Sequence, residues 1–158
     1  MKQNGFTLVE LGIVLSAMSV LTVSTMTYNG FRQAAVHTQV RKALKDIRTG
    51  TAASLTRISI DDAVGHNNWL EYLGDNNFIA TDETHSITFA ENTNIIQAGI
   101  STSYGPAFLA VLMSGLTDTA AEDLLNTEAK TSSYYENAQF PLCNQKVGDQ
   151  YTILCYKL

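Results

Sequence analysis

Proline is nearly absent from this chain, and charge is absent from a long stretch near its amino terminus. The 158 residues include two prolines and ten glycines, which excludes a collagen-like or linker-dominated protein. Hydrophobic residues make up 45% of the sequence, so disorder over the whole chain is excluded as well. The length fits a single folding unit with a sizeable core.

Basic residues are scarce in the carboxy-terminal two thirds of the chain. Residues 58–158 contain three Lys or Arg against thirteen Asp or Glu, a net charge of −10. Residues 1–57 have the opposite balance, with seven basic and two acidic residues and a net charge of +5. The sequence thus divides into a basic arm and an acidic body. We expect no nucleic acid partner, because phosphate binding requires clustered, exposed Lys and Arg and the chain as a whole carries −5.

No charged residue lies between Glu10 and Arg32, and residues 6–28 are apolar or hydroxylated almost throughout. A helix over these residues is about 35 Å long, which is enough to cross a hydrocarbon layer of about 30 Å. Hydroxyl groups in a helix can bond back to a carbonyl in the preceding turn, and small side chains let helices approach closely. The stretch predicts a membrane-spanning helix suited to packing on other helices. Its hydroxylated residues are Ser16, Ser19, Thr22, Ser24, Thr25 and Thr27.

The residues before this stretch do not follow the order of a secretory signal peptide. Such a peptide has its small-residue cleavage site after the apolar run. Here the polar stub Met-Lys-Gln-Asn-Gly ends at Gly5, before the apolar run begins. If the chain is processed at this point, the hydrophobic helix is kept.

The string Gly5-Phe6-Thr7-Leu8-Val9-Glu10-Leu11 resembles the processing and methylation motif of type IV pilins and the related pseudopilins. The resemblance is strong over the amino-terminal segment and extends to the rest of the chain only in layout. It implies cleavage between Gly5 and Phe6 by a prepilin peptidase, methylation of the new Phe6 amine, and assembly into a helical filament. The implied partners are other copies in a homopolymer or mixed pilus, the peptidase, the membrane before assembly and an inner-membrane assembly platform.

Glu10 lies one helical turn after Phe6, and a carboxylate at that depth in a membrane is costly unless it is paired. The resemblance implies that Glu10 of one subunit meets the Phe6 amine of its neighbour and sets the axial step between them. Without the motif, Glu10 would be an ordinary first-turn acid that the helix dipole favours and that reaches toward the membrane surface.

Two signals disagree about orientation in the membrane. Five basic residues lie between Arg32 and Arg48, whereas Lys2 alone precedes the apolar run, and the positive-inside rule then places the carboxy-terminal side in the cytoplasm. The motif implies the reverse, because its peptidase acts on the cytoplasmic face. We follow the motif and expect a prepilin in the inner membrane with its head in the periplasm, and an extracellular pilus after assembly.

The helix is expected to continue without interruption from Phe6 to Arg57. Its second half is amphipathic, because apolar residues recur at steps of three and four. The predicted layout is a cleaved leader (1–5), a hydrophobic helix (6–30), the amphipathic half of the same helix (31–57) and a globular head (58–158). The basic face of the amphipathic half is either solvated or a partner for the acidic body of a neighbouring subunit. The recurring residues are Val36, Val40, Ala43, Leu44, Ile47, Thr51, Leu55 and Ile58.

The sequence of residues 58–158 predicts short strands and little helix. Apolar or alternating runs at 86–90, 95–104, 107–113 and 151–156 are of strand length. A turn at 147–150 separates two extended segments, and a loop-rich connection follows Ile58, with a small helix at 69–73. The Thr119-Ala-Ala-Glu122 spacing predicts the start of another helix. The fold class is therefore α+β, with a long amino-terminal helix packed on a small antiparallel sheet, similar to a pilin.

Cys143 and Cys155 are the only cysteines. Their spacing around a turn allows a disulfide, and two buried free thiols are the alternative. The resemblance favours the bridge, because it implies an oxidising compartment and because pilins have a disulfide in a similar position. Two thiols form only half of a zinc site, so no metal is expected.

No catalytic motif is apparent, so the chain is not expected to be an enzyme or to bind a cofactor. His37, His66 and His85 lack ligand spacing. We expect a structural subunit, either a type IV pilin or minor pilin or, alternatively, a pseudopilin of a type II secretion system. A membrane-anchored periplasmic binding or enzymatic domain is a third interpretation, and a pocket with convergent polar groups would support it.

Overall fold

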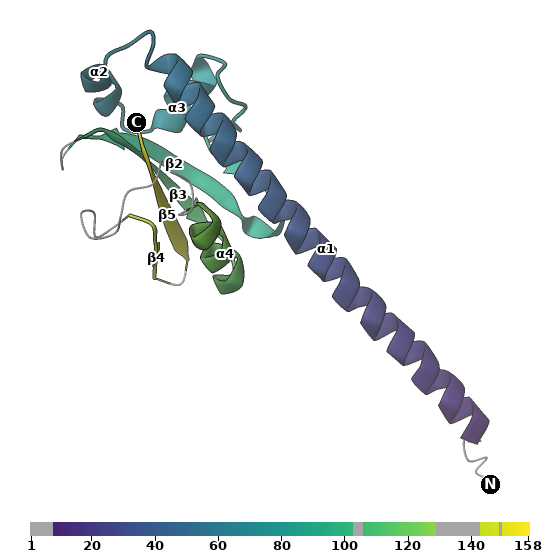
Figure 1. Cartoon of the computed structure of the whole chain (residues 1–158). Coiled ribbons are helices and arrows are strands. Elements are labelled where there is room, and N and C mark those ends of the chain that lie inside the picture. The colour runs from purple at the N-terminus through teal and green to yellow at the C-terminus, as the bar shows by residue number, and fades with distance from the viewer. Residues whose placement is uncertain (1–7, 103–105, 129–142, 149) are drawn as a thin grey trace. The chain divides into compact units, whose positions relative to one another are not determined.

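The computed structural model describes residues 8–102, 106–128, 143–148 and 150–158. These residues form an α+β fold in which a long amino-terminal helix packs on a small antiparallel sheet, which confirms the predicted fold class (Figure 1). The chain divides into two compact units, one ending at Ala35 and the other beginning at Val36. We call the second the head unit. It includes part of the helix as well as the predicted head, so its boundary lies before residue 58.

Helix α1 spans Leu8–Ser54. The predicted first residue, Phe6, lies outside the described residues. The predicted end at Arg57 is three residues too late. The amides of Thr56 and Arg57 bond to the carbonyls of Ala53 and Ser54 in a tighter turn of three-residue steps, and this turn ends the α-helix.

The second half of α1 buries a stripe of apolar side chains in the head unit. Val36, Val40, Leu44 and Ile47 are buried, at steps of three and four residues. Burying a side chain of this kind contributes about 1.5–3 kcal/mol, so the stripe is a major part of the core. This confirms the predicted amphipathic pattern, and the remaining apolar members, Ala43, Leu55 and Ile58, pack against the same core while partly exposed.

The sheet has five strands in the described residues, in the order β1-β2-β3-β5-β4, and every neighbouring pair is antiparallel. Strands β2 and β3 are joined along almost their full length, and β5 pairs β3 from Ser114↔Tyr151 to Phe108↔Lys157. Burial alternates along β2, so one face carries the core. The strands are β1 (Ile87–Thr88), β2 (Asn94–Ser101), β3 (Phe108–Ser114), β4 (Gln145–Val147) and β5 (Tyr151–Lys157).

All four predicted strands are present, with two differences. The first is only Ile87–Thr88, because a 3-10 turn, η1, begins at Ala90 and runs to Asn92. A fifth strand, β4, pairs with β5 across the predicted turn. The sequence predicted an extended segment there but not its pairing, because a three-residue run with Gln145 and Lys146 has no apolar alternation.

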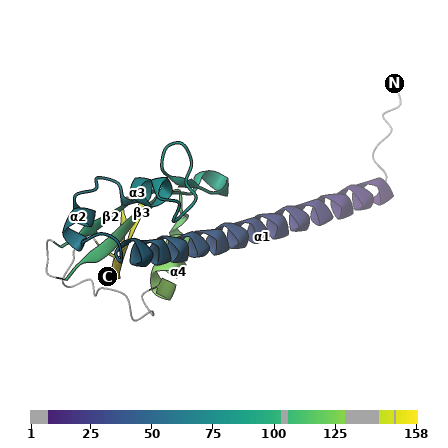
Figure 2. The same ribbon diagram turned by 90° about the horizontal axis from the view of Figure 1, so that it is seen from above.

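Three further helices lie in the head unit: α2 (Ile60–Val64), α3 (Trp69–Asp75) and α4 (Asp118–Glu128). The loop-rich connection predicted after Ile58 contains the expected small helix, as α3, but also α2, which was not predicted. Ser59 accepts the Asp62 amide at 3.1 Å and caps α2. The predicted cap of α4 was wrong by two residues. Thr117, not Thr119, caps it, with its hydroxyl 3.3 Å from the Ala120 amide. Figure 2 shows α3 and α4 on either side of α1.

Trp69 attaches α3 to α1. Its side chain is fully buried, and its indole N–H donates to the hydroxyl of Thr51, also fully buried, at 2.9 Å. The Tyr72 ring stacks on the indole with 4.6 Å between centroids and 12° between planes. Trp69, Leu70 and Leu73 are buried in the core and hold this connection to it.

We predict that Thr51→Val lowers the free energy of unfolding of the full chain by about 1–3 kcal/mol, because the buried indole N–H then has no acceptor. Urea titration followed by far-UV circular dichroism measures the change, because this signal is also present in variants that lack Trp69, the only tryptophan. Combined with Trp69→Phe, which removes the donor, Thr51→Val should cost much less. Equal effects of Thr51→Val in the two backgrounds would contradict the role of this hydrogen bond.

Candidate functional site

The first half of α1 exposes an uninterrupted set of large apolar side chains. From Val9 to Tyr28 none of them is buried, and Val9, Met26 and Phe31 expose 70%, 75% and 76% of their surface. An exposed apolar surface of this extent marks contact with a membrane or with other protein. The exposed set comprises Val9, Leu11, Ile13, Val14, Leu15, Met18, Val20, Leu21, Val23, Met26, Tyr28 and Phe31.

The hydroxyl groups among these residues bond within the helix. Each donates to a carbonyl three or four residues earlier, from Ser16 to Gly12 at 2.7 Å through Thr27 to Val23 at 2.7 Å. Ser19, Thr22, Ser24 and Thr25 do the same. This confirms the expected back-bonding. The helix therefore presents an apolar exterior whose polar groups need no water.

Within the described part of the chain, α1 is the one helix long and apolar enough to cross a membrane. Its candidate span begins at Val9, and no residue of its most apolar window is buried in the chain. In a helix that forms the core of a soluble protein, most of this window would be buried. The coarse prediction of a membrane-compatible amino-terminal helix is therefore confirmed by length, composition and exposure together.

Of the predicted processing and assembly residues, the structure describes Glu10. Gly5 and Phe6 lie outside the described residues. Glu10 is an exposed residue in the first turn of α1, where the helix dipole favours a carboxylate. Its position on the helix is compatible with both roles considered for it, the first-turn acid and the partner of a neighbouring amine.

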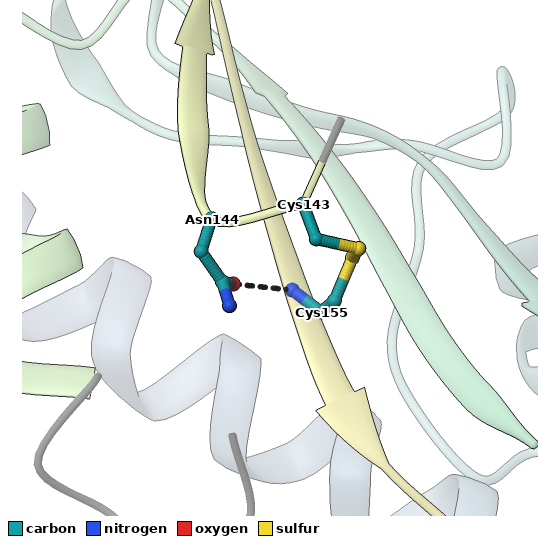
Figure 3. The surroundings of a disulfide bond; sticks show 3 residues. All are labelled: Cys143, Asn144 and Cys155. Atoms are coloured by element: carbon teal, nitrogen blue, oxygen red, sulfur yellow. Dashed lines mark hydrogen bonds between the residues drawn. A yellow bond between two sulfur atoms is a disulfide. The ribbon is translucent and has the colours of Figure 1, made fainter. Parts of the chain in front are cut away.

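Cys143 and Cys155 form a disulfide in the head unit, as the resemblance favoured (Figure 3). Their Cα atoms are 5.5 Å apart, and both residues are buried beside Phe108. Cys143 lies just before β4 and Cys155 lies in β5, so the bridge fastens the entry of the β4–β5 hairpin to the sheet.

Sequence reasoning missed Asn144, which supports the bridge. Its side-chain carbonyl accepts the amide of Cys155 at 2.9 Å, and its backbone has a positive φ of 56° (Figure 3). Asn tolerates this conformation better than most residues. The only signal in the sequence was an Asn beside a cysteine, which is too common to single out.

The basic residues of α1 have different surroundings in the head unit. Arg41 lies 3.4 Å from the Asp123 carboxylate of α4 and donates to the Thr127 hydroxyl at 2.9 Å. His37 is 3.3 Å from the same carboxylate. Burial lowers the pKa of His37, the Arg41 cation lowers it further, and Asp123 partly opposes both. Part of the basic face is therefore paired within the chain, whereas Lys42 and Lys45 are exposed.

Asp82 organises the loop before β1. Its carboxylate accepts the hydroxyl and amide of Thr84 and of Ser86 and the hydroxyl of Thr88, at 2.6–3.0 Å. The hydrogen bond from the Thr84 hydroxyl, followed by those from Ser86, holds the pKa of Asp82 well below its ordinary value. These donors occupy the carboxylate, so it acts as a structural group. Among the described residues, no group of three or more His, Cys, Asp and Glu is placed to hold a metal ion.

No protein family model, curated protein or solved structure matches this chain.

We predict that removing the disulfide with Cys143→Ala and Cys155→Ala lowers the free energy of unfolding by about 3 kcal/mol, because the bridge constrains the unfolded chain. Urea titration of the full chain, read by Trp69 fluorescence, measures this loss. Dithiothreitol should destabilise the unmodified chain and leave the double variant unchanged. If the reductant has no effect on the unmodified chain under unfolding conditions, the bridge does not form.

Proposed function

We propose that this chain is a structural subunit, a type IV pilin or minor pilin, that polymerises through the first half of α1. The observation that carries the proposal is an apolar helix segment with no buried residue that directly follows a prepilin-type cleavage motif. In this proposal a prepilin peptidase cuts between Gly5 and Phe6 and the Phe6 amine is methylated. The chain then moves from the membrane into a filament built of helices like its own.

The physical basis of assembly is a change of surroundings for one apolar surface. In the membrane, lipid covers residues 9–28, and in a filament the same residues of neighbouring subunits cover one another. Because lipid and packed helices are similarly apolar, the transfer depends on close packing and on interhelical polar contacts. The internally bonded hydroxyls present small groups that permit close approach without unsatisfied donors.

Glu10 has the role of setting register in this mechanism. A carboxylate within a bundle of apolar helices is costly unless it is paired, and the amine of a cleaved Phe6 is a cation at the required depth. Residues four apart on a helix are separated along its axis by about 6 Å, and a pair within one chain would fix no offset between subunits. A pair between neighbouring subunits satisfies both charges at one axial offset.

The disulfide supports the proposed orientation. A stable disulfide requires an oxidising compartment, which supports a head unit outside the cytoplasm. This favours the periplasmic head over the orientation that the positive-inside rule predicts. The bridge also favours a pilin over the second candidate, a pseudopilin of a type II secretion system, which would share the amino-terminal features.

The first prediction from this proposal concerns processing. The intact mass of membrane-extracted protein should correspond to loss of Met1–Gly5 and addition of one methyl group at Phe6. Mass spectrometry of protein from a strain with and without prepilin peptidase makes the comparison. A full-length chain from the strain with peptidase would contradict the proposal.

The second prediction concerns Glu10. Glu10→Ala should leave cleavage intact and lower incorporation into filaments at least about tenfold, since an unpaired amine would then remain in the apolar bundle. Sheared surface filaments and the membrane pool are compared by immunoblot. Glu71→Ala, which removes an exposed first-turn acid from α3, is the matched control and should assemble normally. Normal filaments from Glu10→Ala would exclude the proposed pairing.

A further inference from the structure

A basic groove with an apolar floor lies between α1 and the end of β5 in the head unit. Its volume is about 640 Å³. Leu55 and Leu158 contribute apolar surface, the buried Leu109 lies behind it, and Lys45, Arg48 and Lys157 contribute positive charge. Among the described residues that line the groove there is no carboxylate side chain. We call it the α1–β5 groove.

The cations of the α1–β5 groove have two kinds of surroundings: Arg48 packs on an aromatic ring, and Lys45 and Lys157 are exposed. The Arg48 guanidinium lies 4.7 Å from the centre of the Tyr156 ring, whose hydroxyl donates to Glu128 at 3.1 Å. Glu128 therefore borders the groove and offsets part of its charge. Lys45 and Lys157 are exposed, so the groove has a positive potential that attracts an acidic partner.

Helix α2 has the complementary chemistry. Ile60 and Val64 are four residues apart and expose 40% and 39% of their surface, and the exposed Asp61 and Asp62 lie between them. Ala63, on the other side, is fully buried and anchors the helix. Helix α2 lies at the periphery of the head unit in both views (Figures 1 and 2). Its exposed surface therefore combines two apolar side chains with two carboxylates.

We propose that helix α2 of one copy of this chain occupies the α1–β5 groove of another. Its apolar side chains cover the groove floor, and its carboxylates meet Lys45 and Lys157. This inference deepens the proposed pilin function and rests on it, because it assigns a contact between head units to the filament. The two surfaces are different patches of one molecule, and such heterologous contacts propagate into open helical assemblies.

Charge favours a second copy over other occupants of the groove. The acidic residues of the body, net −10 over residues 58–158, repel a nucleic acid or an anionic lipid surface as it approaches the groove. A second copy brings its own acidic body to the basic arm of the first. This is the arrangement in which the uneven charge of the chain is attractive between subunits.

A charge exchange in the full chain tests the contact. Asp61→Lys and Lys45→Glu should each lower the assembled fraction at least about tenfold, because each places like charges opposite one another. The double variant Asp61→Lys with Lys45→Glu should restore assembly to within about twofold of the unmodified chain, since the exchanged pair is again opposite in sign. Sheared filaments are compared with the membrane pool, and the mature mass and Trp69 fluorescence verify processing and folding.

Matched controls separate the contact from general charge effects. Glu71→Lys makes the same charge change at an exposed site on α3, and Lys42→Glu makes it one turn before Lys45 on α1. Both single controls should assemble normally. The double variant Glu71→Lys with Lys45→Glu has the same net charge as Asp61→Lys with Lys45→Glu. It should not restore assembly, because Glu71 lies outside the proposed contact.

The outcomes distinguish this inference from the function on which it rests. If the unmodified chain forms filaments and Asp61→Lys assembles as well as Glu71→Lys, the α2 contact is overturned and the pilin function stands. The same conclusion follows if the Glu71→Lys combination rescues Lys45→Glu as well as Asp61→Lys does. If the unmodified chain is not trimmed and forms no filaments, both proposals are overturned.

Discussion

The rest of the structure depends on where the apolar surface of residues 9–28 is placed. Water cannot be its permanent environment, because removing apolar surface from water is favourable by about 25 cal/mol per Å² and these side chains are largely exposed. The internal bonds of the hydroxyl groups remove the need for water along the backbone as well. A membrane satisfies this constraint for one chain, and a bundle of identical helices satisfies it for many.

The same helix meets a different requirement after Val36. There the apolar residues narrow to a stripe, and the sheet and α3 cover it. The polar pair of Thr51 and Trp69 is the one place in the described core where a side-chain hydrogen bond joins α1 to α3. One continuous α-helix therefore combines a segment that needs an external partner with a segment that completes the core of the head unit. The change occurs in side-chain pattern, with no break in the backbone pattern.

The sequence predicted the parts of this fold that have a strong local period. The stripe from Val36 to Ile47 and strands β2, β3 and β5 follow from apolar spacing alone. Helix α2 was missed because five residues contain too few apolar positions to show a period, and its cap, Ser59, is a common residue in turns. The cap of α4 was misplaced because Thr117 and Thr119 both offer a hydroxyl, and only the tertiary position of Leu124 and Ala121 decides between them.

The candidate site also has parts that the sequence predicted and parts that it did not. Exposure of the apolar residues, and the bridge between Cys143 and Cys155, were expected from composition and motif. The α1–β5 groove was not, because it joins Lys45 on α1 with Lys157 more than a hundred residues later, and no spacing rule relates them. Its charge, which is opposite to that of α2, is a property of the folded surface. The roles of the motif residues Gly5 and Phe6 rest entirely on the sequence.

The uneven charge of the chain constrains how subunits of this kind can associate. Subunits with a net charge of −5 repel one another at long range, and screening at physiological salt limits that repulsion to about 8 Å. Close contacts therefore decide between attraction and repulsion. Arg41 is already paired with Asp123 of its own chain, so the exposed Lys42 and Lys45 are the cations of α1 in the head unit that remain on its outer surface. An assembly that brings acidic residues of the body opposite Lys45 and Lys157 gains contacts that an assembly of body against body would lose. The helix supplies the driving force for polymerisation, and the charge pattern restricts which arrangement of head units accompanies it.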